Sequence, residues 1–108
     1  MGMYGLTDEI AREEAERMLD SYSKTLSDLG YKPEPYPDLE GKVGGNIFAA
    51  GKFEALNHAY WMCGETKNFL RQGREAKALR WLGFIQGLLF LGGVFSIAEL
   101  KGHNRGRI

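Results

Sequence analysis

Apolar side chains recur at helical spacing along most of this chain. In residues 7–29 they stand three and four positions apart, and charged side chains fill the opposite face. The apolar positions are Ala11, Ala15, Met18, Tyr22, Leu26 and Leu29. Thr7 suits the N-cap of a helix, and Gly30 suits the left-handed residue that ends one. The pattern predicts an amphipathic helix over residues 7–29.

Residues 30–46 break this periodicity. Pro33, Pro35 and Pro37 alternate with other residues, and three glycines follow at 41, 44 and 45. Prolines disfavour helix and favour an extended path. We therefore expect a connector over residues 30–46 that carries the first helix away from the rest of the chain.

Helical spacing returns over residues 47–72 and 74–93. The first of these segments carries two neighbouring apolar stripes, which indicates a wide buried arc. Gly73 between them predicts a tight turn and an antiparallel hairpin. Ser96 and Glu99 then form a capping-box pattern, which predicts a short helix over residues 96–101. The predicted fold is a single all-α domain.

The second half of the hairpin is unusually apolar, because Gln86 is the only polar residue between positions 81 and 95. Gly83 and Gly87 form a GxxxG step, where missing side chains let another backbone approach closely. We expect Gly83, Gly87, Gln86 and Phe84 to form an oligomer interface, in which a buried Gln86 would fix the register. The alternative is that the two glycines pack against the preceding helix.

A membrane helix is a further interpretation of this run. Residues 81–98 comprise 18 positions, which is the lower limit for crossing a bilayer. Four glycines, the central Gln86 and the capping box at Ser96 count against it. A membrane-associated protein is therefore the third of three functional hypotheses.

Composition narrows the class of protein. Apolar residues make up 44% and charged residues 26%, which is typical of a globular domain and not of a disordered one. A single cysteine, Cys63, forms no internal disulfide, and the start of the chain lacks the basic residues of a secretion signal. We expect a cytoplasmic protein.

The formal net charge of zero hides an uneven distribution. Residues 1–54 hold 11 acidic and 6 basic side chains, whereas residues 55–108 hold 3 and 8. Five of the later cations follow helical spacing on either side of the Gly73 turn: Lys67, Arg71, Arg74, Lys77 and Arg80. The alternatives are a site for a phosphate or an acidic partner, or a solvated tip neutralised locally by Glu65 and Glu75.

Arg80 is the strongest candidate within this cluster. Its planar guanidinium suits phosphate or carboxylate, and it stands beside Trp81 and the Gly83 step. The candidate set for binding a ligand or partner is Arg80, Lys77, Trp81, Arg74, Arg71 and Lys67. A small anionic ligand fits such a cluster, and a nucleic acid is a less favoured partner.

No residue pattern indicates catalysis or a metal. Cys63 and His58 stand five positions apart, which places them on different sides of a helix. Cys63, His58 and His103 show no metal-ligand spacing. His58 follows Glu54 by four residues, which suits a surface hydrogen bond or ion pair. We expect a non-enzymatic protein without a cofactor.

The C-terminal half resembles small, uncharacterised bacteriophage-encoded proteins. The resemblance covers residues 57–104 and rests on the segment RWLGFIQG at 80–87, together with the following residues: Asn57, His58, Trp61, Met62, Cys63, Gly73, Arg74, Ser96, Ile97, Glu99, Leu100, Lys101 and Asn104. It implies a phage setting and hence the cytoplasm of a bacterial host. Small phage proteins of this kind often bind and block a host factor.

Two hypotheses lead. The first is a homo-oligomeric helical protein that binds and blocks a host protein, such as a component of host defence. The second is a module that binds or sequesters a small phosphorylated ligand such as a nucleotide signal.

Overall fold

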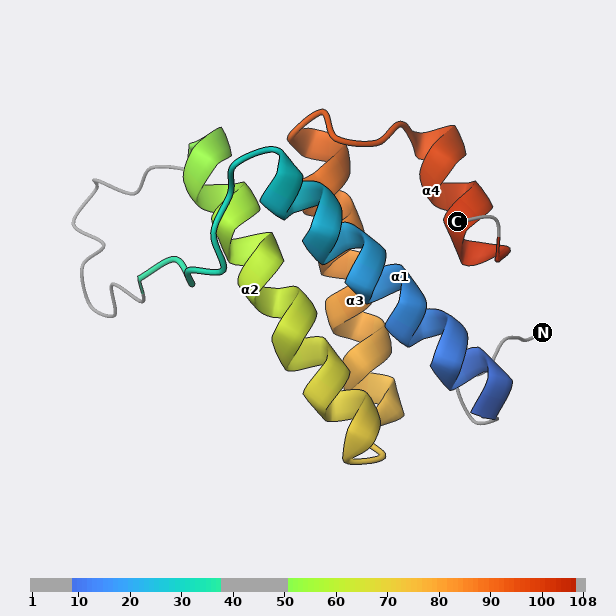
Figure 1. Ribbon diagram of the computed structural model, residues 1–108. Coiled ribbons are helices and arrows are strands. Elements are labelled where there is room, and N and C mark those ends of the chain that lie inside the picture. The colour runs from blue at the N-terminus through green and yellow to red at the C-terminus, as the bar shows by residue number, and fades with distance from the viewer. Residues whose placement is uncertain (1–8, 38–50, 107–108) are drawn as a thin grey trace.

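Four helices make up most of the described chain. The computed structural model describes residues 9–37 and 51–106, and within them the helices are α1 (Glu9–Asp28), α2 (Lys52–Arg71), α3 (Glu75–Leu91) and α4 (Ile97–Asn104) (Figure 1). The described residues contain no strand. The predicted all-α fold with an antiparallel α2–α3 hairpin is confirmed.

The helix ends follow the local chemistry of the chain. Gly30 and Gly73 have φ of 97° and 77°, which is the left-handed conformation expected after a helix end. Ser96 and Glu99 form both hydrogen bonds of the capping box. Gly51 has an extended backbone, so α2 begins at Lys52, later than residue 47. Thr7 lies outside the described residues.

The first helix lies against the hairpin and does not extend away from it. In Figure 1, α1 crosses α2 and α3 on one side, and α4 lies beyond α1 near the end of α3. The buried apolar stripe of α1 and the buried face of α2 form the core, joined by one stripe of α3. The expectation that the connector separates α1 from the hairpin was therefore wrong. The amphipathic stripe of α1 explains why, since it must be covered to be removed from water.

A buried hydrogen-bond network ties α4 to this core. Tyr22 is fully buried, and its hydroxyl lies 2.8 Å from Nδ1 of His103 on α4. Gln86 on α3 donates to the same hydroxyl at 3.0 Å and to Oδ1 of Asn104 at 2.9 Å. Phe95 packs on both rings, with centroid distances of 5.6 Å to Tyr22 and 4.8 Å to His103. Residues from α1, α3 and α4 thus meet at one tyrosine hydroxyl.

We expect Tyr22→Phe to destabilise the fold by about 1–3 kcal/mol, because it leaves Nδ1 of the buried His103 without a partner. Equilibrium unfolding in urea measures this loss. Tyr60→Phe removes the hydroxyl of a half-buried tyrosine on α2 and is the matched control. Equal stability of the two variants would contradict a structural role for the network.

Candidate functional site

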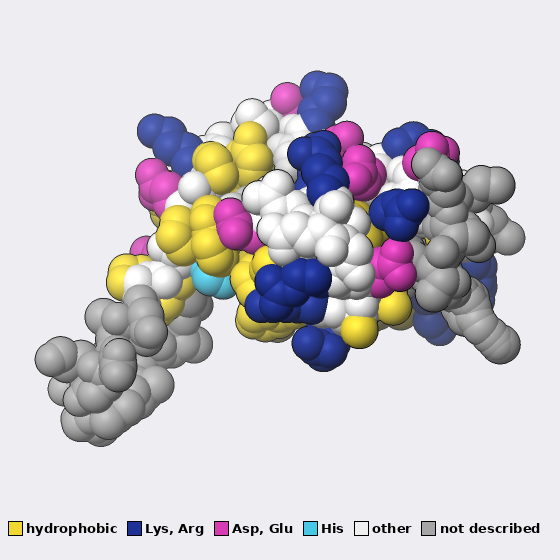
Figure 2. All heavy atoms as spheres, turned by 90° about the horizontal axis from the view of Figure 1, so that it is seen from below, with side chains coloured by type: hydrophobic (Ala, Val, Ile, Leu, Met, Phe, Trp, Pro, Cys, Tyr) yellow, Lys and Arg dark blue, Asp and Glu magenta, His cyan; other side chains and the backbone are white. Residues whose placement is uncertain are grey.

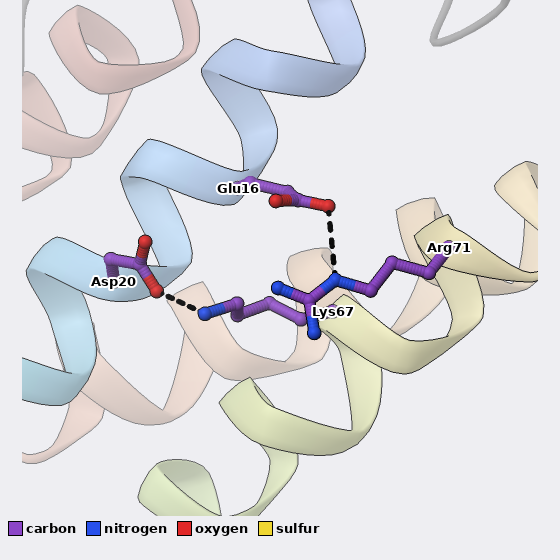
Figure 3. A network of polar contacts seen from close by, with 4 residues as sticks. All are labelled: Glu16, Asp20, Lys67 and Arg71. Carbon is purple, nitrogen blue, oxygen red and sulfur yellow. Dashed lines mark hydrogen bonds and ion pairs between the residues drawn. The ribbon is translucent and has the colours of Figure 1, made fainter.

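Two of the five predicted basic residues hold the helices together. Lys67 forms an ion pair with Asp20, and the Arg71 Nε lies 3.6 Å from a carboxylate oxygen of Glu16 (Figure 3). Both acidic residues belong to α1, so these pairs join α1 to α2. Lys67 and Arg71 were predicted to bind a ligand, and in the structure each pairs with an acidic side chain of α1.

The acidic residues expected to neutralise the hairpin tip are arranged differently from the prediction. Glu75, in the first turn of α3, accepts a hydrogen bond at 2.9 Å from Arg12 of α1. Glu65 forms no ion pair with a described residue. Glu75 is therefore engaged by α1, which leaves the neighbouring cations of the tip available to other groups.

Arg74 and Lys77 lie over aromatic rings at this tip. The guanidinium carbon of Arg74 is 5.1 Å from the centroid of the Phe69 ring. The Lys77 Nζ is 4.6 Å from the Phe69 centroid and 5.8 Å from the Trp81 ring. These are cation–π distances. Figure 2 looks onto the end of the molecule where α2 turns into α3, and shows Lys and Arg side chains there beside hydrophobic ones.

The rings continue along the hairpin as a row of aromatic contacts. Trp81 meets Phe69 edge-on at 4.9 Å and lies 6.0 Å from Trp61, which in turn lies 5.3 Å from His58. Phe84 and Leu88 extend the row on α3, and Tyr36 of the connector lies beside His58. We call this set the aromatic face; its members are Tyr36, His58, Trp61, Phe69, Trp81, Phe84 and Leu88.

Helical spacing explains why these side chains share one face. On α2, positions 58, 61, 65 and 69 are three or four apart, as are positions 77, 81, 84 and 88 on α3. The residues of α2 that contact α1, Lys67 and Arg71 among them, lie on a different side of the helix. The aromatic face therefore lies on a side of the hairpin that α1 leaves uncovered.

A shallow pocket of about 270 Å³ opens at the far end of the aromatic face. Tyr36, Ala55, His58, Phe84 and Leu88 line it, so its walls come from the connector, α2 and α3. His58 and the hydroxyl of Tyr36 are its polar side-chain groups. The pocket is open and mostly apolar.

Asn57 and His58 hold the connector against this pocket. Asn57 Oδ1 accepts the backbone N–H of Lys32 at 2.9 Å, and His58 Nδ1 accepts that of Tyr36 at 2.8 Å. Prolines at 33, 35 and 37 have no N–H, and Glu34 donates its own to the Lys32 carbonyl. Every N–H between residues 32 and 37 is thus paired. The spacing had suggested that His58 pairs with Glu54, but in the structure His58 accepts a hydrogen bond from the connector.

The hydrogen bond to His58 also decides where its proton is. Because Nδ1 accepts the N–H of Tyr36, the neutral ring carries its hydrogen on Nε2. Partial burial lowers the pKa of His58, which favours this neutral form. His58 can therefore donate one hydrogen bond from Nε2 without carrying a charge.

Arg80, the strongest candidate from the sequence, is exposed one turn beyond Lys77 on α3. It makes no ion pair with the described residues. Arg74, Lys77 and Arg80 are therefore the cations of this region that form no ion pair with a described residue, and Lys77 lies beside the Trp81 ring. Arg80 also borders the outer surface of α3, where Gly83 and Gly87 lie.

The predicted oligomer residues separate into different environments. A Cβ built on Gly83 or Gly87 meets no atom within 4 Å, so the glycines do not pack against α2, and that alternative was wrong. Phe84 is 55% exposed and lines the pocket. Gln86 points to α1 and α4 through its bonds to Tyr22 and Asn104. It sets the position of α4 and does not face outward with the glycines.

Cys63 lies fully buried in the core, as its position on the apolar stripe predicts. Burial raises the pKa of its thiol to about 12, although a hydrogen bond with Ser23 opposes this shift. A protonated, inaccessible thiol is unsuited to nucleophilic attack. His103 is occupied by Tyr22, and the described residues contain no group of three side chains able to hold a metal ion.

Sequence reasoning missed Trp61, Phe69, His58 and Tyr36 as members of the aromatic face. The signal was present on α2, because His58, Trp61 and Phe69 stand at spacings that place them on one side of a helix. The position of Tyr36 had no such signal, since it depends on hydrogen bonds between the connector backbone and α2.

Comparisons of the chain with protein-family models, with curated proteins and with solved structures find no match. Within residues 9–37 and 51–106, no helix has both the length and the apolar character needed to cross a membrane.

We expect the free energy of unfolding to be constant between about pH 7 and pH 9 and to fall between pH 9 and 12. The pKa of Cys63 rises from 9.0 to about 12 on folding, and burial raises that of Tyr22 from 10.0 to about 12. In this range the unfolded chain loses protons that the folded chain retains, so rising pH favours unfolding. Urea unfolding at several pH values measures the effect.

Cys63→Ala is the matched variant, because it removes one of the two titrating groups. Its stability at pH 7 falls through the lost packing, but its further loss above pH 9 should be smaller than that of the wild type. Thiol labelling gives an independent check, since Cys63 should react slowly until the protein unfolds. Rapid labelling of the native protein would contradict the buried, protonated thiol.

Proposed function

We propose that the protein is a non-enzymatic binding module for a small phosphorylated aromatic ligand, of which a nucleotide is the simplest example. The observation that carries the proposal is the position of Lys77 over the rings of Phe69 and Trp81, with Arg74 over Phe69 and Arg80 exposed one turn away. Cations beside half-buried aromatic rings suit a ligand with both an anionic and a planar part.

The anionic part would bind at the hairpin tip. Arg74, Lys77 and Arg80 supply three cations over seven residues, and none of them forms an ion pair with a described acidic side chain. Arg74 is the N-cap of α3, and no side chain caps the first N–H groups of this helix. Helix N-termini favour anions, and the engagement of Glu75 by Arg12 weakens the competing negative charge.

The planar part would lie along the aromatic face towards the pocket. Positions 77 and 84 of α3 stand seven residues apart, which is about 10 Å along a helix and comparable to the length of a nucleotide. Trp81 and Trp61 lie between the tip and the pocket, where half-buried rings offer edges for stacking. His58 at the pocket supports recognition of a ring nitrogen or carbonyl, because its neutral Nε2–H donates.

A host protein remains the alternative partner from the sequence, and no observation on the described residues favours it over a small ligand. A nucleic acid is less suited to this surface. Non-specific nucleic-acid binding depends on many phosphate contacts, whereas the tip offers three cations in one place. The phage setting implied by the segment at residues 80–87 likewise remains a prediction.

Intrinsic fluorescence offers a direct readout, because both tryptophans of the chain, Trp61 and Trp81, belong to the aromatic face. We expect titration with nucleoside mono-, di- and triphosphates and with cyclic dinucleotides to change this fluorescence for at least one class. Lys77→Gln and Arg80→Ala should each weaken binding about 10- to 100-fold, as expected for a charge-assisted hydrogen bond.

Lys101→Gln is the matched control, since Lys101 is an exposed cation on α4, away from the hairpin tip. Added salt should weaken binding by the wild type. Equal affinity of Lys77→Gln and Lys101→Gln would place the ligand elsewhere. An unchanged fluorescence and melting temperature with every nucleotide would exclude this ligand class and leave an acidic protein segment as the next partner to test.

A further inference from the structure

The outer surface of α3 is a second exposed surface, separate from the aromatic face. Three of its residues are large apolar side chains with little cover: Leu79 is 47% exposed, Phe90 47% and Leu91 79%. Phe84, at 55%, lies between this surface and the aromatic face. We call Leu79, Arg80, Gly83, Gly87, Phe90 and Leu91 the outer face. Neither α1 nor α2 covers it, because the stripe of α3 that joins the core is formed by Ala78, Leu82, Ile85 and Leu89.

The outer face is almost free of charge. From position 78 to position 91, Arg80 is the only charged residue. An occupant of this surface must therefore be apolar and must offer one group that suits a guanidinium.

The spacing of the outer face makes it complementary to itself. Leu79 and Phe90 stand 11 residues apart, which is about three helical turns, so they lie on the same side of α3. Arg80 and Leu91 have the same separation and share the other side. Gly83 and Gly87 lie between the two sides, and the midpoint of all three pairs falls near Ile85.

We propose that the outer face binds a second copy of this chain, with two α3 helices antiparallel about a twofold axis at the level of Ile85. In this arrangement Leu79 of each copy packs on Phe90 of the other. Gly83 of each copy faces Gly87 of the other, and the open space above both glycines admits the second backbone.

The one charge on the outer face has a partner in this arrangement. Arg80 of each copy reaches Leu91 and the C-terminal turn of the other α3. That helix ends without a basic residue in its last turn. The unpaired carbonyl groups at a helix C-terminus carry partial negative charge, which favours a cation there. Arg80 of the second copy supplies the cation that each α3 lacks, and in the dimer Arg74 and Lys77 remain as the cations of the proposed ligand site.

The contact comes mainly from one helix of each copy, so we expect an equilibrium that dilution reverses. Sedimentation velocity from about 5 to about 500 µM should show monomer converting to dimer. Leu79→Glu and Phe90→Lys each place a charge against an apolar side chain of the second copy, and each should leave a folded monomer by circular dichroism. A wild type that stays monomeric across this range would overturn the proposal.

The antiparallel register has its own test. The double variant Leu79→Glu/Phe90→Lys, and an equal mixture of the two single variants, should both regain dimer, because the new charges face each other across the contact. Dimers that survive Leu79→Glu would show that the copies meet elsewhere. If the single variants are monomeric, and neither the double variant nor the mixture forms a dimer, the antiparallel register is wrong.

Gly87→Leu provides a variant that spares the monomer. Nothing lies within 4 Å of a Cβ there, and leucine favours helix more than glycine does, so the fold should not weaken while dimerisation is lost. Lys101→Gln on α4 is the control. A different outcome would also overturn the proposal. If the wild type stays monomeric in solution but binds phospholipid vesicles, and Leu79→Glu abolishes that binding, the occupant of the outer face is a lipid surface. None of these variants changes a cation or ring of the proposed ligand site, so failure here leaves that proposal standing.

Discussion

The contact between α1 and the α2–α3 hairpin decides what the rest of the molecule can do. Three features hold α1 on one side of the hairpin: its buried apolar stripe, the ion pairs of Asp20 and Glu16 with α2, and the Tyr22 hydroxyl. Among the described residues, α1 is the one long helix outside the hairpin. Covering one side of the hairpin leaves the other sides exposed, and these carry the aromatic face and the outer face of α3.

The same contact divides the basic residues by role. Lys67 and Arg71 lie on the side of α2 that meets α1, where acidic side chains pair with them. Arg74, Lys77 and Arg80, at the turn and on the first turns of α3, form no ion pair with the described residues of α1. Cations that are neighbours in sequence thus have different surroundings. Those before the turn at Gly73 pair with α1, and those after it face another side of the molecule.

The helices and their ends were predictable from the sequence because they depend on local chemistry. The capping box at Ser96 and the left-handed glycines at positions 30 and 73 act within a few residues of themselves. The packing of α1 was not predictable in the same way. Prolines in the connector indicate an extended path, but they do not reveal that Asn57 and His58, 25 and 22 residues further on, accept its N–H groups.

The candidate site was predicted in part for a similar reason. Charge and spacing identified Arg80, Lys77 and Trp81. Lys77 does lie beside the Trp81 ring, whereas Arg80 is exposed on the outer surface of α3. The roles of Lys67, Arg71 and Gln86 depend on partners from α1 and α4, which periodicity within one helix does not reveal. Periodicity shows which residues share a side of a helix. Which sides remain exposed depends on how the helices pack against one another.

The attachment of the connector has a consequence for how this segment can vary. Asn57 and His58 bind only main-chain N–H groups, so the side chains of Lys32 and Glu34 take no part in the attachment. What matters is the distance along the chain between two N–H groups and the absence of a competing donor at Pro33 and Pro35. The side chains at positions 32 and 34 can therefore vary, but the insertion or deletion of one residue between positions 32 and 36 would place a proline nitrogen, or a displaced N–H, opposite an acceptor on α2. The attachment of this stretch is fixed by its length and by the spacing of its prolines.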